Sequence, residues 1–119
     1  MKYLCLVYCD EKLFQGMTPN DWRSLTGECV AYGDGLRETG HFVAGEPLHF
    51  VKTATTVRVR DGKVTATDGP FAETKEQLAG FYLIEARDRE EAVRLASRIP
   101  PARVGSIEVR PVRDMHERP

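Results

Sequence analysis

The sequence contains no long hydrophobic run. The apolar stretch nearest the N-terminus covers seven residues, Tyr3 to Cys9, and stops at Asp10 and Glu11, whereas a helix that crosses a bilayer needs roughly 18 apolar residues. No cleavage site of small residues follows this stretch, as it would in a signal peptide. We therefore expect a cytoplasmic protein that does not associate with membranes.

An excess of charge of one sign is also missing. The chain has 17 basic and 18 acidic side chains, and its formal net charge is −1. Such a balance creates no field of one sign that would attract polyanions. Direct binding to nucleic acid is therefore not expected.

Cysteine and histidine are few and poorly spaced for cross-links or metals. Cys5 and Cys9 would lie about 13 Å apart on an extended strand, too far for a disulfide or a shared metal ion. The histidines, His41, His49 and His116, lack the short spacing of a metal site. We expect buried cysteines that act as small apolar residues, no metal and no cofactor.

The chain length and the apolar patterns predict one α+β domain. A chain of 119 residues is long enough for one core and too short for two, so residues 1–119 form a single domain. Residues 3–8 and 78–86 are apolar on both parities, which is typical of central strands covered on both faces.

A helix is predicted to begin at Pro19, with Thr18 as its N-cap and Asp21 in its first turn, and to end before Gly40. Apolar residues recur at spacings of three and four along it, a stripe that indicates a face packed on the core. The stripe consists of Trp22, Leu25, Cys29, Tyr32 and Leu36.

The middle of the chain predicts a short strand at 41–45, followed by a loop at 46–53 that is placed to rim a pocket. Thr56, Arg58 and Arg60 then alternate with valines, Asp61-Gly62 supplies a tight turn, and the alternation continues over 63–67. This pattern predicts a β-hairpin.

A second helix is predicted after Asp88, whose side chain caps it together with Glu91. It carries Ala92, Leu95, Ala96 and Ile99 inward until Pro100-Pro101 stops it, and a last strand follows at 106–112. The order of elements is that of a ferredoxin-like plait with an inserted β-hairpin. Two helices cover only one face of such a sheet, so we predict a homodimer that covers the other face.

Candidate site residues gather around the turn at Gly69-Pro70. Asp68 is expected at the end of a strand, where it is either a general base or substrate anchor, or a residue that hydrogen-bonds its own turn. His41, the imidazole closest to a strand end, is a second acid–base candidate, although a half-buried structural histidine fits as well.

Ligand-binding candidates follow the turn. Phe71 is either a lid over a pocket or a packing anchor. Glu73 and Lys75, with Glu76, are candidates for an ion-pair cluster that faces an anionic or polar ligand, or for a solvated loop. Thr74 with Gln77 fits a capping box that would order this segment as one helical turn. Tyr82 completes the predicted ligand-binding set.

The run DGPFAETKEQLAGFYLIE at 68–85, with Met1-Lys2-Tyr3, Gly45-Glu46 and Ile99-Pro100-Pro101, resembles the DGPF branch of the YCII-related proteins. The resemblance implies a dimeric α+β barrel with clefts near the ends of the sheets. Some members of the wider group resemble acid–base enzymes with a His-Asp pair. This chain has Cys29 and Glu38 near those positions, so that chemistry does not carry over.

Two functions fit these residues. The first is a small-molecule-binding protein, in its catalytic form a weak acid–base lyase or isomerase, whose cleft at the dimer interface is lined by Asp68, Phe71, Glu73, Lys75 and Tyr82. The second is a non-catalytic regulatory or interaction module, since the resemblance implies a link to sigma-factor-dependent transcription. Both an enzyme and a non-catalytic protein are compatible with the sequence.

Overall fold

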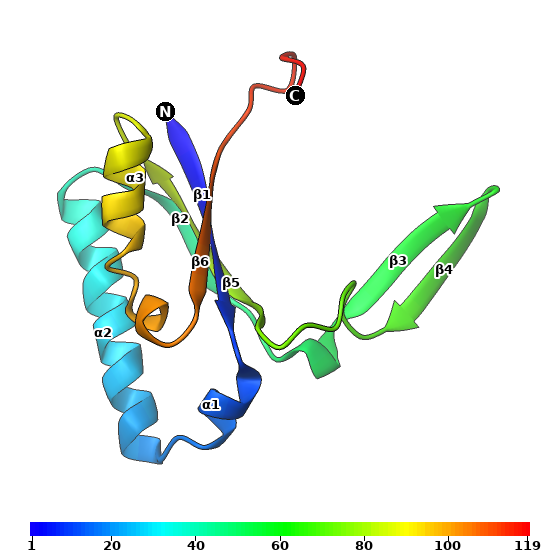
Figure 1. Cartoon of the computed structure of the whole chain (residues 1–119), viewed down its shortest axis with the longest axis horizontal. Helices are drawn as coiled ribbons and strands as arrows, with labels where there is room; N and C mark the ends of the chain where they lie inside the picture. The colour runs from blue at the N-terminus through cyan, green and yellow to red at the C-terminus, as the bar shows by residue number, and fades with distance from the viewer.

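The computed structural model describes all residues, 1–119, and has an α+β architecture, as expected (Figure 1). Its larger sheet is antiparallel, in the order β2-β5-β1-β6. The strands are β1 (Lys2–Cys9), β2 (Phe42–Pro47), β5 (Gln77–Glu85) and β6 (Ser106–Pro111). The two strands that are apolar on both parities, β1 and β5, occupy the two central places, which confirms that prediction.

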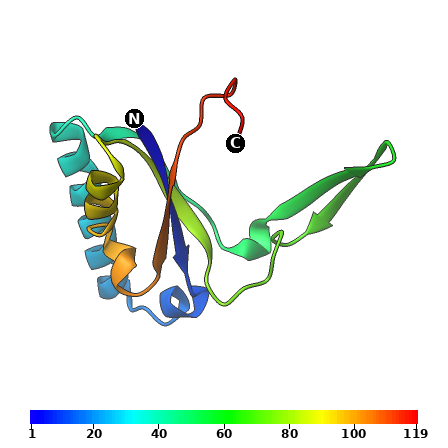
Figure 2. The ribbon, with the colours of Figure 1, turned by 45° about the horizontal axis from the view of Figure 1, so that its top comes forward.

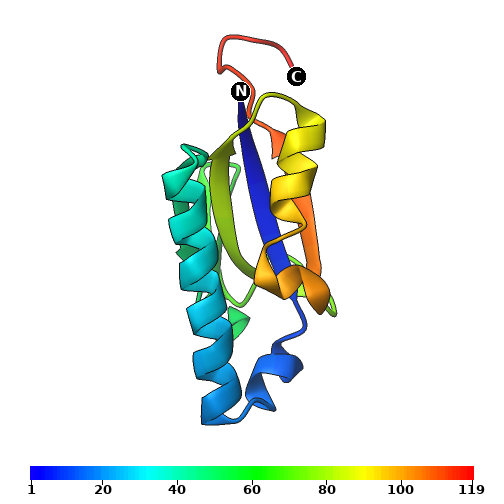
Figure 3. The same cartoon turned by 90° about the vertical axis from the view of Figure 1, so that its left-hand side faces the viewer.

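Two helices, α2 (Pro19–Glu38) and α3 (Arg89–Ala96), lie over the same face of this sheet (Figure 3). The predicted start of α2 is confirmed: Thr18 Oγ1 accepts from the Asp21 N–H at 3.1 Å, and the Asp21 carboxylate accepts from the Thr18 N–H at 3.4 Å. The helix runs without interruption through its glycines to Glu38. A short helix that the sequence pattern did not predict, α1 (Glu11–Gln15), is capped by Asp10.

The cap of α3 is also confirmed, because Asp88 Oδ1 accepts from the Glu91 N–H at 2.9 Å. The helix ends at Ala96, before the predicted Ile99, and the N–H groups of Arg98 and Ile99 bond to carbonyls three residues back. Ile99 is nevertheless buried. The 3₁₀-helix η2 (Pro100–Arg103) then leads to β6.

The core lies between the sheet and the helices. One parity of β1 faces this layer, and Cys5 and Cys9 are completely buried there beside Ile84 of β5. Burial raises the pKa of both thiols to about 11. These cysteines therefore stay protonated near neutral pH and act as small apolar residues, as predicted.

The opposite face of the sheet has no helix over it (Figure 2). The other parity of β1 points to this face, where Leu4 is opposite Leu83 and Leu6 is opposite Phe81. All four side chains are half-exposed. We call this surface the open sheet face.

The predicted hairpin forms a separate sheet of two strands, β3 (Thr55–Arg60) and β4 (Lys63–Asp68). Its turn places Asp61 at φ 50° and Gly62 at φ 75°, the left-handed conformation that a two-residue hairpin turn requires. The 3₁₀-helix η1 (Val51–Thr53) precedes it. The hairpin projects from the molecule on the side of the open sheet face (Figures 1 and 2).

No helix of the structure has both the length and the apolarity to cross a membrane. No group of three or more histidine, cysteine, aspartate or glutamate side chains gathers closely enough to hold a metal ion.

Candidate functional site

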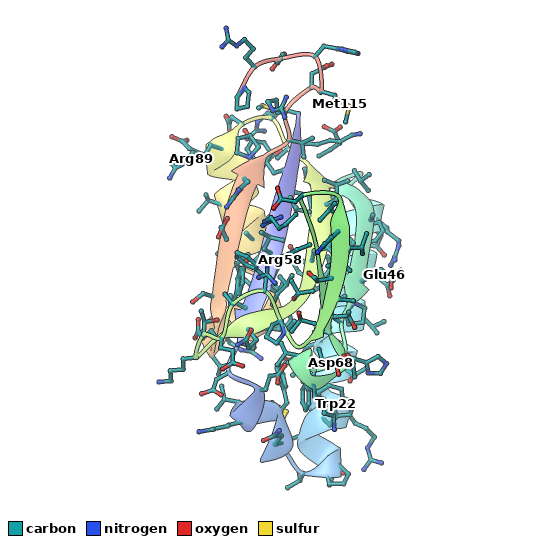
Figure 4. The ribbon with its side chains drawn as sticks, turned by 90° about the vertical axis from the view of Figure 1, so that its right-hand side faces the viewer. Trp22, Glu46, Arg58, Asp68, Arg89 and Met115 are labelled. Atoms are coloured by element: carbon teal, nitrogen blue, oxygen red, sulfur yellow. The ribbon has the colours of Figure 1, made fainter.

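Asp68 is the last residue of β4 and is exposed, at the base of the hairpin (Figure 4). The turn that follows it is held by backbone groups: the Gly69 N–H donates to the Ala54 carbonyl at 2.8 Å, and Thr56 Oγ1 donates to the Gly69 carbonyl at 2.9 Å. Gly69 has φ 111°, a conformation that side-chain-bearing residues rarely adopt. The turn is as predicted, and the groups that hold it do not include the Asp68 carboxylate.

The residues after this turn form an irregular, exposed loop. Phe71 is 82% exposed, and its ring centre lies 5.8 Å from the Arg58 guanidinium. It therefore does not anchor packing within one chain. Glu73 and Lys75 are exposed as well.

The predicted helical turn at Thr74–Gln77 is wrong. Thr74 Oγ1 donates to the Glu76 carbonyl at 2.7 Å and Gln77 Nε2 donates to the Thr74 carbonyl at 2.7 Å, so the two side chains hold a bend before β5 begins. Gln77 pairs with Cys9 as the first residue of β5. Pairing of Gln77 with β1 therefore takes precedence over a local capping box. The predicted ion-pair cluster does not include Glu76 either, because this carboxylate accepts a hydrogen bond from Ser106 Oγ at 2.6 Å.

His41 lies at the other end of the sheet. Its Nδ1 is 2.7 Å from the carbonyl of Glu85, the last residue of β5, and 3.9 Å from Glu91 Oε1. The segment that carries Asp68 precedes the first residue of β5, and the eight steps along this strand span about 26 Å. His41 and Asp68 are therefore not brought into one site, and the contacts of His41 are those of a half-buried structural histidine.

Glu91, on α3, is the charged group with the most partners. It accepts from the Arg87 N–H at 3.0 Å and lies 3.1 Å and 3.3 Å from the guanidinium groups of Arg87 and Arg94. The hydrogen bond from the Arg87 backbone, followed by the charges of Arg87, His41 and Arg94, lowers the pKa of this carboxyl. These contacts fix the start of α3, which is a structural role.

A groove of about 700 Å³ lies between α2 and the sheet edge formed by β2. We call it the α2 groove. The first half of the apolar stripe on α2 lines it, with Trp22, Leu25 and Cys29, and Tyr82 lies at the sheet side. The stripe was predicted to pack on the core, and this holds for Leu36, which is buried, whereas Trp22 is 52% exposed.

Aromatic rings close one end of the α2 groove. Phe14 of α1 contacts Trp22 edge to face, with ring centres 6.0 Å apart, and lies 6.3 Å from Phe50. The segment from Glu46 to Phe50 forms the outer rim, and Glu11 Oε2 holds it by accepting from the Val51 N–H at 2.9 Å. The prediction that the loop after the second strand rims a pocket is thus confirmed.

The polar side chains that line the α2 groove, besides Tyr82, are Glu11, Thr26, Arg37, Glu46 and His49. Tyr82 packs edge to face on Tyr32 at 5.2 Å, and the Tyr32 hydroxyl donates to the Leu95 carbonyl at 2.8 Å. Tyr82 as a whole is half-buried, but its hydroxyl has no such partner in the chain and is accessible from outside. Arg37 lies over the Phe42 ring at 4.1 Å and bonds Asp34 at 3.2 Å.

Burial sets the protonation of the groove. It raises the pKa of Tyr82, an effect that the Cys29 side chain reinforces and the Arg37 charge opposes. Burial also raises the pKa of Cys29. The phenol is therefore a neutral hydrogen-bond donor near neutral pH, and the thiol is not an activated nucleophile.

A second hollow, of about 520 Å³, lies between α3 and the β1–β6 side of the sheet. Its walls are mainly aliphatic, and its polar residues are Arg89 and Ser97. Neither its residues nor those of the α2 groove include Asp68, Phe71, Glu73 or Lys75. Of the ligand-binding residues predicted from the sequence, Tyr82 is in a groove.

Comparison with known proteins gives two matches. A family model described as a YCII-related domain matches residues 1–116. An uncharacterized protein of Rhizobium meliloti (strain 1021) is 35% identical over 114 residues, which cover 94% of this chain and 92% of the relative.

Proposed function

The chain belongs to the YCII-related domain family, and we propose that it binds a small molecule in the α2 groove. The observation that carries the proposal is a groove of about 700 Å³ that is lined by several aromatic side chains, among them the half-buried Tyr82, whose hydroxyl has no hydrogen-bond partner in the chain. Ligand sites in proteins are typically about 300–1,000 Å³, mostly apolar, with a few polar groups that orient the ligand. The α2 groove has this composition.

Two of these polar groups, the Tyr82 hydroxyl and the Arg37 guanidinium, define the class of ligand. A neutral phenol donates one hydrogen bond, and the nearby Arg37 guanidinium is a cation with several donors. A ligand that complements both groups has an apolar or aromatic body and an acceptor such as a carbonyl or carboxylate oxygen. Aromatic keto acids and aryl carboxylates belong to this class.

A catalytic form of this function would use the Tyr82 hydroxyl as a hydrogen-bond donor to the carbonyl oxygen of the ligand. Because burial raises the pKa of the phenol, the group keeps its proton near neutral pH and polarises the carbonyl through a hydrogen bond. The groove residues include no pair of a histidine and a carboxylate in contact. Weak lyase or isomerase activity, with Asp68 or His41 as the base, stays a prediction.

We also propose a homodimer with the ferredoxin-like plait of a dimeric α+β barrel. The strand order β2-β5-β1-β6, with both long helices on one face, supports the plait. The half-exposed leucines and phenylalanine of the open sheet face support the second copy. The motif Asp68-Gly69-Pro70-Phe71 supports the DGPF branch of the family.

The ligand proposal is tested with a matched pair of tyrosine variants. A set of aromatic keto acids and aryl carboxylates is first screened for compounds that raise the unfolding temperature. Tyr82→Phe removes the hydroxyl in the groove and is expected to weaken the best compound roughly tenfold, the worth of about one hydrogen bond. Isothermal titration calorimetry measures the affinity.

Tyr32→Phe is the control, because it removes a hydroxyl from the neighbouring ring outside the groove. It loses the bond to the Leu95 carbonyl and is expected to cost about 1 kcal/mol of stability with unchanged affinity. Equal affinities of Tyr82→Phe and wild type would reject the role of Tyr82. A screen without any stabilising compound would reject the ligand class.

The second hypothesis, an interaction module linked to sigma-factor-dependent transcription, stays a prediction. Affinity purification of the tagged protein from its native extract tests it. A co-purifying sigma factor would support the hypothesis, and a clean preparation of this chain alone would count against it.

A further inference from the structure

The hairpin of residues 55–68, which we call the arm, has one apolar face and one polar face. In its register Val57 is opposite Ala66 and Val59 is opposite Val64, and facing residues in a pair point to the same side. The other side carries the pairs Thr56–Thr67, Arg58–Thr65 and Arg60–Lys63. The arm is therefore amphipathic, a pattern that normally marks a sheet packed against another layer.

No other part of the chain covers the apolar face of the arm. Val57, Val59 and Val64 are 62%, 57% and 70% exposed. The arm is joined to the rest of the molecule at its base, and its tip extends away from the larger sheet (Figures 1 and 2). An isolated two-stranded hairpin is at best marginally stable in water, so the arm needs a surface to pack on.

The open sheet face lacks a cover in the same way. The arm and this face lie on the side of the sheet opposite to α2 and α3, and they diverge from the base of the arm so that they flank a wedge-shaped space (Figure 2). Both apolar surfaces are therefore left for another body to cover.

The chain exposes more surface than a compact monomer of its mass. The chain exposes 8714 Å², whereas a compact protein of 13.4 kDa exposes roughly 6,500 Å². Its radius of gyration is 16.3 Å, against about 13.5 Å for a compact domain of this length. The excess of roughly 2,200 Å² is more than twice the roughly 800 Å² that one partner buries in a standard interface, as expected for a chain that is completed by a permanent subunit contact.

We propose that the arm is an exchange arm: its valine face packs on the open sheet face of a second copy of this chain, while the arm of that copy packs on the first. A two-fold axis makes the contact self-complementary, because each chain supplies one arm and one open sheet face. The inference rests on the homodimer proposed above and specifies which surfaces form it.

The exchange also bears on the predicted site. Asp68 lies at the base of the arm and Phe71 just beyond it. An arm that crosses to the other copy carries these residues to the subunit interface, so the exposed side chains around Gly69-Pro70 contribute to a surface made by two chains.

The first experiment compares two double variants of the arm by light scattering coupled to gel filtration. Val59→Asp with Val64→Asp places carboxylates on the apolar face, and Thr65→Asp with Thr67→Asp places them on the polar face. All four side chains are exposed in one chain, so both variants are expected to fold, as circular dichroism checks. The valine variant is expected to weaken dimerisation about 100-fold or more, and the threonine variant less than tenfold.

The second experiment identifies the surface that the arm meets. The photo-crosslinking residue p-benzoylphenylalanine replaces Val59 in one sample and Thr65 in the other, and each is mixed with ¹⁵N-labelled wild type. Val59 is expected to form mixed-label cross-links to peptides of β1 or β5, and Thr65 is expected to form none there.

The outcomes separate the two proposals. A wild type that is monomeric overturns both the homodimer and the exchange arm. A wild-type dimer that survives in the valine variant, or cross-links from Val59 that avoid β1 and β5, overturns the exchange arm and leaves the homodimer in place. Ligand binding in the α2 groove is measured separately and does not depend on either outcome.

Discussion

The two faces of the sheet β2-β5-β1-β6 carry similar side chains but differ in what covers them. Toward the helices, Cys5, Cys9 and Ile84 are completely buried. Toward the open sheet face, Leu6 and Phe81 are half-exposed. Successive residues of a strand point to opposite faces, so one short sequence specifies both surfaces at once.

This difference shows what can be predicted from a strand whose residues are mostly apolar. Apolar residues on both parities of β1 and β5 indicate that each face is to be covered, and one chain covers only one of them. The α2 helix illustrates the same point within a single element. Its stripe is continuous in sequence, yet Leu36 is buried in the core while Trp22 borders the α2 groove.

The largest expected effect comes from truncating side chains on the two faces of one strand. Ile84→Ala opens a cavity in the helix-covered layer, where Ile84 is completely buried, and is expected to cost about 3–4 kcal/mol. Leu83→Ala, on the open sheet face, is expected to cost about 1 kcal/mol at protein concentrations where the chain is monomeric. Urea unfolding followed by circular dichroism measures both.

The difference between the stability losses of the two variants is expected to depend on protein concentration. If a second copy covers the open sheet face, the loss caused by Leu83→Ala grows as the protein is concentrated, because dimerisation contributes to stability by mass action. The loss caused by Ile84→Ala is already complete in one chain. Equal losses for the two variants at low concentration would show that the two faces do not differ as described.

A smaller effect tests the charged group that borders the covered face. The folded pKa of Glu91 is lowered, first by the hydrogen bond from the Arg87 N–H. The unfolded chain therefore binds the proton more readily, so this contribution is complete above the unfolded pKa of about 4.3 and is lost as the pH falls through the folded value. Wild type should lose stability on acidification, and Glu91→Gln should lose less.

The measurement is the free energy of unfolding between pH 7 and pH 3, and Glu90→Gln is the matched control. Glu90 is the exposed neighbour on the same turn, so its variant should follow the wild-type pH profile. A Glu91→Gln profile that is parallel to wild type would assign the acid sensitivity to other carboxyls.

Local signals predicted most of the fold. The Thr18–Asp21 cap, the Asp61-Gly62 turn and the pairing of Asp88 with Glu91 are all formed by residues within three positions of one another. The central places of β1 and β5 followed from parity. Where a local signal competed with a long-range one, as at Thr74–Gln77, the sequence prediction was wrong, because pairing of Gln77 with Cys9 decides the conformation.

The candidate site was less accessible to sequence reasoning. A helical stripe reports that a face is apolar, but it does not distinguish a core from a groove, so Trp22 and Cys29 were assigned to packing. The sequence also did not show which candidate residues lie close together in the fold. His41 and Asp68 both lie near strand ends, yet His41 precedes β2 of the larger sheet, whereas Asp68 ends β4 of the separate two-stranded sheet.

The substitution Asp68→Asn is expected to have the smallest effect on stability. It tests whether the base of the arm belongs to a ligand site. Asp68 is exposed and the turn after it is held by backbone and Thr56 bonds, so the substitution should change stability by less than about 0.5 kcal/mol. Asp61→Asn is the matched control, since it removes the same charge at the opposite end of the arm and asparagine tolerates the left-handed conformation of that position. If the base of the arm belongs to a ligand site, Asp68→Asn weakens the compound found in the thermal screen and Asp61→Asn does not. Unchanged calorimetric affinities for both variants would confine ligand binding to the helix-covered side of the sheet, where the α2 groove lies.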